Sequence, residues 1–129
     1  MIPTLFRFCS RENSTVAAHF EAKSDDGSRI VIPPMVFYEI KRGLLALNAT
    51  RKMQEFEELF DVLGIREISY SVLDRATHIY AFLRKIGRIV SDADIIIAAF
   101  CLVHDCILVT NNTKDFASIE GLSLEDWTK

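Results

Sequence analysis

Acidic and amide side chains stand at three points of the sequence where apolar segments meet polar ones. Glu39 lies within a largely apolar segment, Asp94 directly precedes an apolar run, and Asn112 follows another apolar segment. Carboxylate and amide oxygens are the ligands that hard cations such as Mg²⁺ and Mn²⁺ prefer. If the fold brings these three side chains together, they form a site for a divalent cation.

Glu39 has two interpretations. It borders the apolar stripe of a predicted amphipathic helix, and a solvated glutamate is ordinary at such an edge. Gly43 and Ala46 lie on the same flank one and two turns further along, and their small side chains would leave space for a ligand beside the carboxylate. Both interpretations stay open on the sequence alone.

Asp94 also has a purely structural interpretation. Ser91 is a predicted N-cap, Asp94 then occupies a position close to that of a capping box, and Asp92 also favours a helix N-terminus. The helix that follows is apolar on every face, so these carboxylates lie at the rim of the core, where burial is costly unless a cation is bound. Capping and metal binding both fit this pattern. Asn112 and Asp115, for their part, are common turn residues.

The elements that must position these residues alternate between strands and helices. Short strands are predicted at 29–32, 65–70, 106–110 and 122–124. A short helix is predicted at 14–23, and an all-round apolar helix follows Ser91. Three amphipathic helices are predicted from the stripes Phe37/Ile40/Leu44/Leu47, Met53/Phe56/Phe60/Leu63 and Val72/Ala76/Ile79/Leu83/Ile86.

The ends of these helices carry their own signals. Pro34 suits a first helical turn, Gly64 suits the position after a last one, and Ser71 with Asp74 predicts a capping box. Strands that alternate with helices predict an α/β fold with a parallel sheet covered by helices on both faces. Ligands of such sheets bind beyond the carboxyl ends of the strands, which is where the three polar segments fall.

Length and composition limit the classes of protein to which this sequence can belong. The 129 residues fit one domain spanning 1–129, and 50% hydrophobic with 26% charged residues is an ordinary globular composition. A formal net charge of −3 argues against a protein that coats nucleic acid by bulk charge. No apolar run approaches the ~20 residues of a membrane helix. Three cysteines without paired spacing indicate free thiols, so we expect a soluble cytoplasmic protein.

Several of these segments together resemble a known family. DIIIAA at 94–99, LVTNNTKDF at 108–116, and GL at 121–122 with EDW at 125–127 closely resemble VapC-type PIN-domain ribonuclease toxins. Val36 to Ile40, followed by Gly43, matches the helix that carries the first glutamate of that family. The resemblance runs from about Asn13 to Trp127.

This resemblance implies a fold, an activity and partners. It implies a PIN-like three-layer α/β/α fold with a small parallel sheet in the strand order 3-2-1-4-5. It also implies RNA cleavage that depends on Mg²⁺ or Mn²⁺, a homodimer, and a VapB-like antitoxin whose C-terminal tail blocks the site. By position, Glu39 and Asp94 would be acidic metal ligands and Asn112 would take the place of the fourth acid. Asp92 would be an auxiliary ligand.

One expected element is missing from the N-terminal segment. The family begins with a central strand that ends in Asp-Thr-Asn, and that aspartate is a principal metal ligand, whereas residues 1–10 contain no acid. The family's spacing places the aspartate at about Met1 or Ile2. A reading frame shifted by two bases would read GAT, an Asp codon, across these two residues. The alternative is a divergent N-terminus in which 4–8 serves as the first strand, and the gene sequence distinguishes the two.

The missing acid leaves two functions open. A site of three or four carboxylates that has lost one should bind Mg²⁺ weakly and act slowly. We therefore expect an impaired endoribonuclease. The alternative is a catalytically inactive PIN-fold module that binds an antitoxin or RNA.

Overall fold

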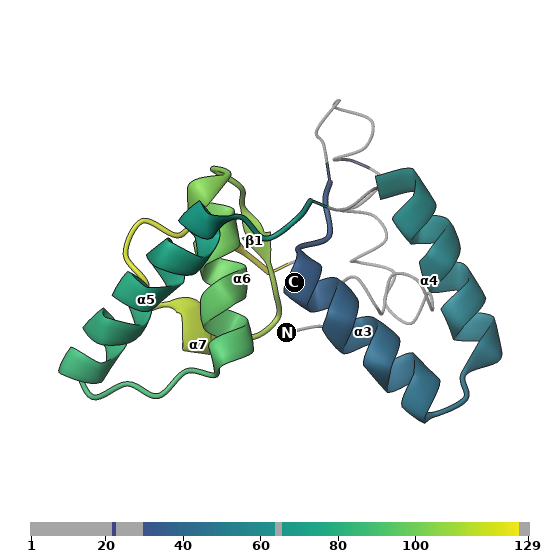
Figure 1. The fold of residues 1–129 in the computed structure, drawn as a ribbon, viewed down its shortest axis with the longest axis horizontal. Helices are drawn as coiled ribbons and strands as arrows, with labels where there is room; N and C mark the ends of the chain where they lie inside the picture. The colour runs from purple at the N-terminus through teal and green to yellow at the C-terminus, as the bar shows by residue number, and fades with distance from the viewer. Residues whose placement is uncertain (1–21, 23–29, 64–65, 127–129) are drawn as a thin grey trace. The chain divides into compact units, whose positions relative to one another are not determined.

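The computed structural model describes residue 22, residues 30–63 and residues 66–126 (Figure 1). These residues belong to two compact units, one that ends at Arg66 and one that spans Glu67–Asp126. The helix predicted at 14–23, except for residue 22, and the altered first strand lie outside the described residues, as does Gly64. A single domain over 1–129 stays a prediction.

The first unit is built on two helices, α3 (Pro34–Ala46) and α4 (Thr50–Leu63), which a short turn joins (Figure 1). Pro33 is the N-cap of α3 and Pro34 opens its first turn, where a missing N–H removes no helical hydrogen bond. Asn48 in the turn has a φ of 51°, a left-handed conformation that asparagine tolerates. Both helices predicted for this region are confirmed.

Three phenylalanines join α3 to α4. The ring centroid of Phe37 lies 5.6 Å from that of Phe56 and 4.8 Å from that of Phe60. Such aromatic pairs contribute about 0.5–1.5 kcal/mol each beyond the area they bury. Leu47, predicted as the end of the α3 stripe, is instead 79% exposed, because it is the C-cap residue and lies past the last helical turn. The remaining buried aliphatic side chains described in this unit are Ile32, Val36, Ile40 and Leu44.

The second unit begins with α5 (Tyr70–Lys85), whose buried face consists of Val72, Ala76, Ile79 and Leu83. Ser69 is its N-cap, and the Ser69 hydroxyl accepts a hydrogen bond from the Val72 backbone N–H at 3.3 Å. The strand predicted at 65–70 and the capping box predicted at Ser71 are therefore wrong. A local cap at Ser69 starts the helix two residues earlier, and residues 66–69 form no strand.

Helix α6 (Asp92–Val103) packs against α5 and supplies much of the core of this unit. Its buried residues are Ile95, Ile97, Ala98, Ala99, Phe100 and Cys101, which confirms the all-round apolar helix predicted from the sequence. The helix ends in a Schellman motif: Asp105 has a φ of 53°, and the Cys106 N–H donates to the Cys101 carbonyl at 2.8 Å. Burial raises the pKa of the Cys101 thiol to about 12, so this cysteine is a core residue.

Two short parallel strands complete the unit. β1 (Leu108–Val109) pairs with β2 (Leu124–Glu125), with Leu108 opposite Leu124. Both strands fall at or beside the positions predicted from the sequence. Between them lies the short helix α7 (Thr113–Phe116), anchored by Phe116, which is fully buried. The carboxyl end of β1 therefore leads directly into the segment that carries Asn112.

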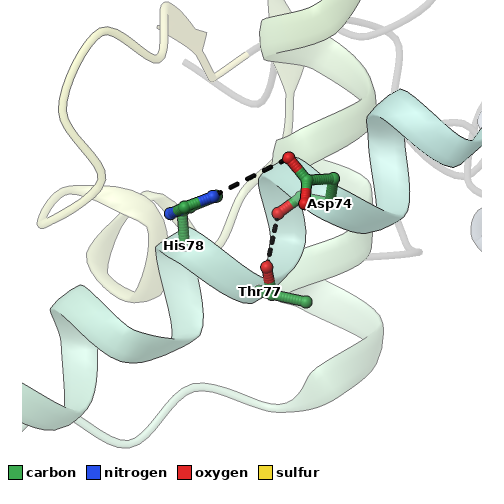
Figure 2. A network of polar contacts seen from close by, with 3 residues as sticks. All are labelled: Asp74, Thr77 and His78. Atoms are coloured by element: carbon green, nitrogen blue, oxygen red, sulfur yellow. Dashed lines mark hydrogen bonds and ion pairs between the residues drawn. The ribbon is translucent and has the colours of Figure 1, made fainter.

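The outer face of α5 carries a small polar network. The Thr77 hydroxyl donates to the Asp74 backbone carbonyl at 2.6 Å, and His78 Nε2 lies 3.7 Å from Asp74 Oδ2 (Figure 2). Asp74 and His78 are largely exposed, so this ion pair contributes little to stability. Among the described residues, no helix is both long and apolar enough to cross a membrane.

Candidate active site at the start of α6 and the end of β1

The start of α6 fixes the position of Asp94. Ser91 is the N-cap, in an extended backbone conformation, and its Oγ accepts a hydrogen bond from the Asp94 backbone N–H at 3.2 Å. This bond confirms the predicted cap. Because it involves the backbone of Asp94, it holds the residue in place without settling what the carboxylate does.

The environment of the Asp94 carboxylate disfavours its charge. Burial raises the pKa of Asp94 above its ordinary value of 3.8, and the nearby Asp115 carboxylate raises it further. A hydrogen bond with the Ser91 side chain acts in the opposite direction but does not cancel the rise. Asp94 is therefore a partly buried carboxylate with a second acid nearby, as expected for a residue at the rim of the core.

The end of β1 positions a second carboxylate. Thr110 is fully buried, and its Oγ1 accepts a hydrogen bond from the Asn112 backbone N–H at 3.0 Å. The side-chain Nδ2 of Asn112 in turn donates to Asp115 Oδ2 at 2.8 Å. Asn112 makes no side-chain cap on α7, although it is the N-cap residue. Its side chain instead orients the carboxylate of Asp115.

Asp115 is the residue to which sequence reasoning assigned no role. Asp115 lies in α7, the short helix after β1, three positions beyond Asn112. Its negative charge contributes to the raised pKa of Asp94, which lies twenty-one positions earlier in the chain. In the sequence, Asn112 and Asp115 follow a predicted apolar strand, and this could have indicated a site. The same two residue types are also ordinary in turns, so the pattern does not distinguish the two interpretations. The structure thus brings Asp94, Asn112 and Asp115 together in one unit.

Glu39 and Asp92 are placed differently. Glu39 is a half-buried residue of α3 in the first unit, and a Cβ built on Gly43, one turn further along, would meet no atom within 4 Å. The space that the sequence predicted beside Glu39 at that position is therefore present. Asp92 is the first residue of α6 and is exposed.

The acidic residues of the second unit suit a hard divalent cation. Asp94 and Asp115 supply two carboxylates whose mutual repulsion a cation would relieve. In the part of the chain that the structure describes, no group of three or more His, Cys, Asp or Glu side chains is arranged to hold a metal ion. Asp94 and Asp115 thus form a pair that fits a cation but leaves its coordination incomplete.

Comparison with known proteins defines the class. The family model of the PIN domain matches residues 5–122, which is most of the chain and covers the greater part of each unit. The protein therefore belongs to the PIN domain family, and the predicted family resemblance is confirmed.

Two individual members of that family show which of its proteins this chain is similar to. The chain is 29% identical to ribonuclease VapC2 of Rickettsia felis over 104 residues, which cover 78% of this chain and 75% of the relative. It is 43% identical over 56 residues to the tRNA(fMet)-specific endonuclease VapC of Shigella flexneri, covering 41% of this chain and 42% of that protein.

Solved structures agree on the fold. VapBC2 of Rickettsia felis, bound to a DNA fragment from its promoter, superposes with a TM-score of 0.89 at 21% identity, covering 98% of this chain and 95% of that chain. DNA-bound VapBC of Salmonella typhimurium gives a TM-score of 0.86 at 22% identity, with the same coverage. The chain thus has the PIN fold, with its small parallel sheet.

Proposed function

We propose that the protein is a metal-dependent endoribonuclease of the VapC type, which hydrolyses phosphodiester bonds in RNA. The observation that carries this proposal is the coupling of Asp94 to an Asp115 carboxylate that Asn112 holds in place beyond the end of a parallel strand. Relatives named ribonuclease and endonuclease support the class of reaction. Clustered carboxylates of this kind are suited to holding a divalent cation.

In this proposal each polar residue has a separate task. Asp94 and Asp115 would hold Mg²⁺ or Mn²⁺, with Glu39 as a third carboxylate and Asp92 as an auxiliary one. A bound divalent cation supplies Lewis-acid stabilisation of the charge that develops on the phosphate. The N-cap at Ser91 holds the backbone of Asp94, so that its carboxylate stays at the rim of the core.

The place predicted for Asn112, that of a fourth acid, is better suited to Asp115. The Asn112 amide nitrogen donates to Asp115, so the amide acts through the carboxylate beside it. We therefore assign Asn112 a positioning role. The distinction is testable because Asn112→Asp would remove this donor and place a third negative charge beside Asp94 and Asp115.

The proposal is tested by cleavage of a fluorescently labelled single-stranded RNA by the full chain, with Mg²⁺, Mn²⁺ or EDTA. We expect cleavage only with a cation. The variants Asp94→Asn, Asp115→Asn and Glu39→Gln each remove a proposed metal ligand, so their cleavage rates should fall by more than the ~10–100-fold that follows loss of a residue that only supports a ligand. Asp74→Asn, on the outer face of α5, is the matched control and should leave the rate unchanged. Cation-independent cleavage, or full activity in Asp94→Asn, would contradict the proposal.

The alternative function is a non-catalytic module that binds an antitoxin or RNA. The observation that favours it is the absence of any acid in residues 1–10, where the family carries its first aspartate. Titration with Mn²⁺, measured by calorimetry, distinguishes the two functions. An endoribonuclease with a weakened site binds Mn²⁺ and loses that binding in Asp94→Asn, whereas the module binds none.

The partners that we propose for this protein are based on the solved structures that it resembles. The matching solved structures from Rickettsia felis and Salmonella typhimurium are VapBC complexes, so we propose that a VapB-like antitoxin binds this protein in the cytoplasm. We also propose a homodimer, which the family resemblance implies. Light scattering of the purified chain at several concentrations tests the dimer.

A further inference from the structure

Arg88 lies in the short segment that connects α5 to α6. Helix α5 ends in a Schellman motif, in which Gly87 has a φ of 75° and the Arg88 N–H donates to the Leu83 carbonyl at 2.9 Å. This motif fixes the backbone of Arg88 close to the N-cap of α6 at Ser91. Arg88 is therefore held near the start of the helix that carries Asp94.

The side chain of Arg88 reaches the other half of the candidate site. Its Nη2 donates to the backbone carbonyl of Lys114 at 3.1 Å, joining residues that are 26 positions apart in the chain. Lys114 directly precedes Asp115 on α7. The guanidinium group is thus held beside the helix that carries the second carboxylate.

Among the described residues, Arg88 forms no ion pair with a carboxylate. Its hydrogen bond goes to a neutral carbonyl, and the ion pairs between described residues join Arg51 to Glu55 and Asp74 to His78. Arg88 is exposed, and a single bond to Lys114 leaves further N–H donors of its planar group available. A guanidinium of this kind matches the two oxygens of a phosphate.

We infer that Arg88 binds a backbone phosphate of the RNA beside the Asp94–Asp115 pair. The inference rests on the proposed ribonuclease function and names a residue that would position its substrate. Negative carboxylates repel RNA, and Arg88 places a cationic group three residues before the N-cap of α6 and in hydrogen-bond contact with α7, the two helices that carry Asp94 and Asp115. Contacts of this type are independent of base sequence and depend on salt concentration.

The test is fluorescence anisotropy of a 5′-fluorescein-labelled single-stranded oligouridine RNA, titrated with the full chain in EDTA over a range of NaCl concentrations. Loss of one phosphate contact in Arg88→Gln should lower the slope of log affinity against log salt by about 0.7. Affinity at low salt should fall about tenfold. Arg88→Lys keeps the charge and should keep the slope while losing part of the affinity.

Arg75→Gln is the matched control, because it removes one exposed cation from the same unit, in the first half of α5. It should bind the RNA as the unaltered chain does. Thermal unfolding of each variant separates a lost contact from a lost fold, since a purely structural role of Arg88 predicts a lower melting temperature with an unchanged salt slope.

Three results would overturn the inference. An unchanged slope and affinity in Arg88→Gln would do so while leaving the ribonuclease proposal intact. A variant that binds RNA normally but loses affinity for a labelled polyglutamate peptide would assign Arg88 to an acidic protein partner instead. A chain that neither binds nor cleaves RNA under any condition would overturn the inference and the proposed function together.

Discussion

The helices of the two units are stabilised in different ways. Helices α3 and α4 have no acid in the first turn and no base in the last, and α3 has no capping side chain. Helix α5 has a serine cap and two bases in its last turn, whereas α6 has a serine cap and two acids in its first. The C-terminus of α3 is closed by backbone hydrogen bonds, with the Ala49 N–H donating to the Leu44 carbonyl at 3.1 Å, whereas the helix ends in the second unit are also specified by side-chain caps and favourable charges. Without such caps and charges, the helices of the first unit depend more on the packing between them.

This difference bears on the two acids proposed for catalysis. Asp94 is placed by a cap that involves its own backbone, so its position depends on a few neighbouring residues. Glu39 lies within α3, and its position depends on how that helix packs against α4 through the phenylalanines. A change in the core of the first unit should therefore affect Glu39, and a change at the start of α6 should affect Asp94.

The largest effect is expected from Phe56→Ala in the first unit. Phe56 is 1% exposed and packs against the rings of Phe37 and Phe60, so the change should lower the free energy of unfolding by about 3–5 kcal/mol. Urea denaturation measures it. Val62→Ala on the same helix is the control, because Val62 is 81% exposed and its loss should stay within about 0.5 kcal/mol. Similar losses in the two variants would mean that packing does not hold α4.

A smaller effect is expected from the caps of the second unit. Ser91→Ala and Ser69→Ala each remove a hydrogen bond to a backbone N–H and should cost about 1 kcal/mol, within a range of about 0.5–2. Ser71→Ala is the matched control, because Ser71 is exposed within the first turn of α5 and is not its cap. An equal loss in Ser71→Ala would restore the capping box that the structure replaces.

Charges at the helix ends should give opposite effects in the two units. Asp61 lies in the last turn of α4, where a negative charge opposes the helix dipole, so Asp61→Asn should stabilise the protein by about 0.3–1 kcal/mol. Lys85 lies in the last turn of α5, and Lys85→Gln should destabilise it by a similar amount. Both effects should shrink in high salt. A change in stability of the same sign in Asp61→Asn and Lys85→Gln would contradict this difference between the two units.

The pH dependence of Asp94 is expected to be the smallest effect. Its pKa is raised above 3.8, so the native state binds the proton more tightly than the unfolded chain does. The free energy of unfolding therefore falls as pH rises from about 3.8 through the native pKa, and the loss persists above it. Asp94→Asn lacks this loss, so it should gain on the unaltered chain as pH rises, in urea denaturation with EDTA. If the difference in the free energy of unfolding between Asp94→Asn and the unaltered chain does not vary with pH, the raised pKa of Asp94 is contradicted.

Local patterns predicted the elements well, and long-range contacts explain the failures. The cap at Ser91 and the burial of α6 follow from a short segment, and both were predicted. The strand expected at 65–70 failed because alternation of side chains cannot create a pairing partner, whereas the hydrogen bond at Ser69 needs only the next three residues. Asp115 received no role because its coupling to Asp94 joins distant parts of the chain. The motifs at 94–99 and 108–116, by contrast, were sufficient to indicate the family.

The buried hydroxyl of Thr110 gives the site a measurable kinetic signature. The Asn112 N–H is directed at Thr110 Oγ1, and the Thr110 N–H donates to the Glu125 carbonyl of β2. Exchange of the Asn112 amide hydrogen with solvent therefore requires this loop to open from the strand pair. That rate reports the free energy of local opening at the loop that holds Asp115. A bound cation that needs the closed loop will slow it, whether or not the chain cleaves RNA.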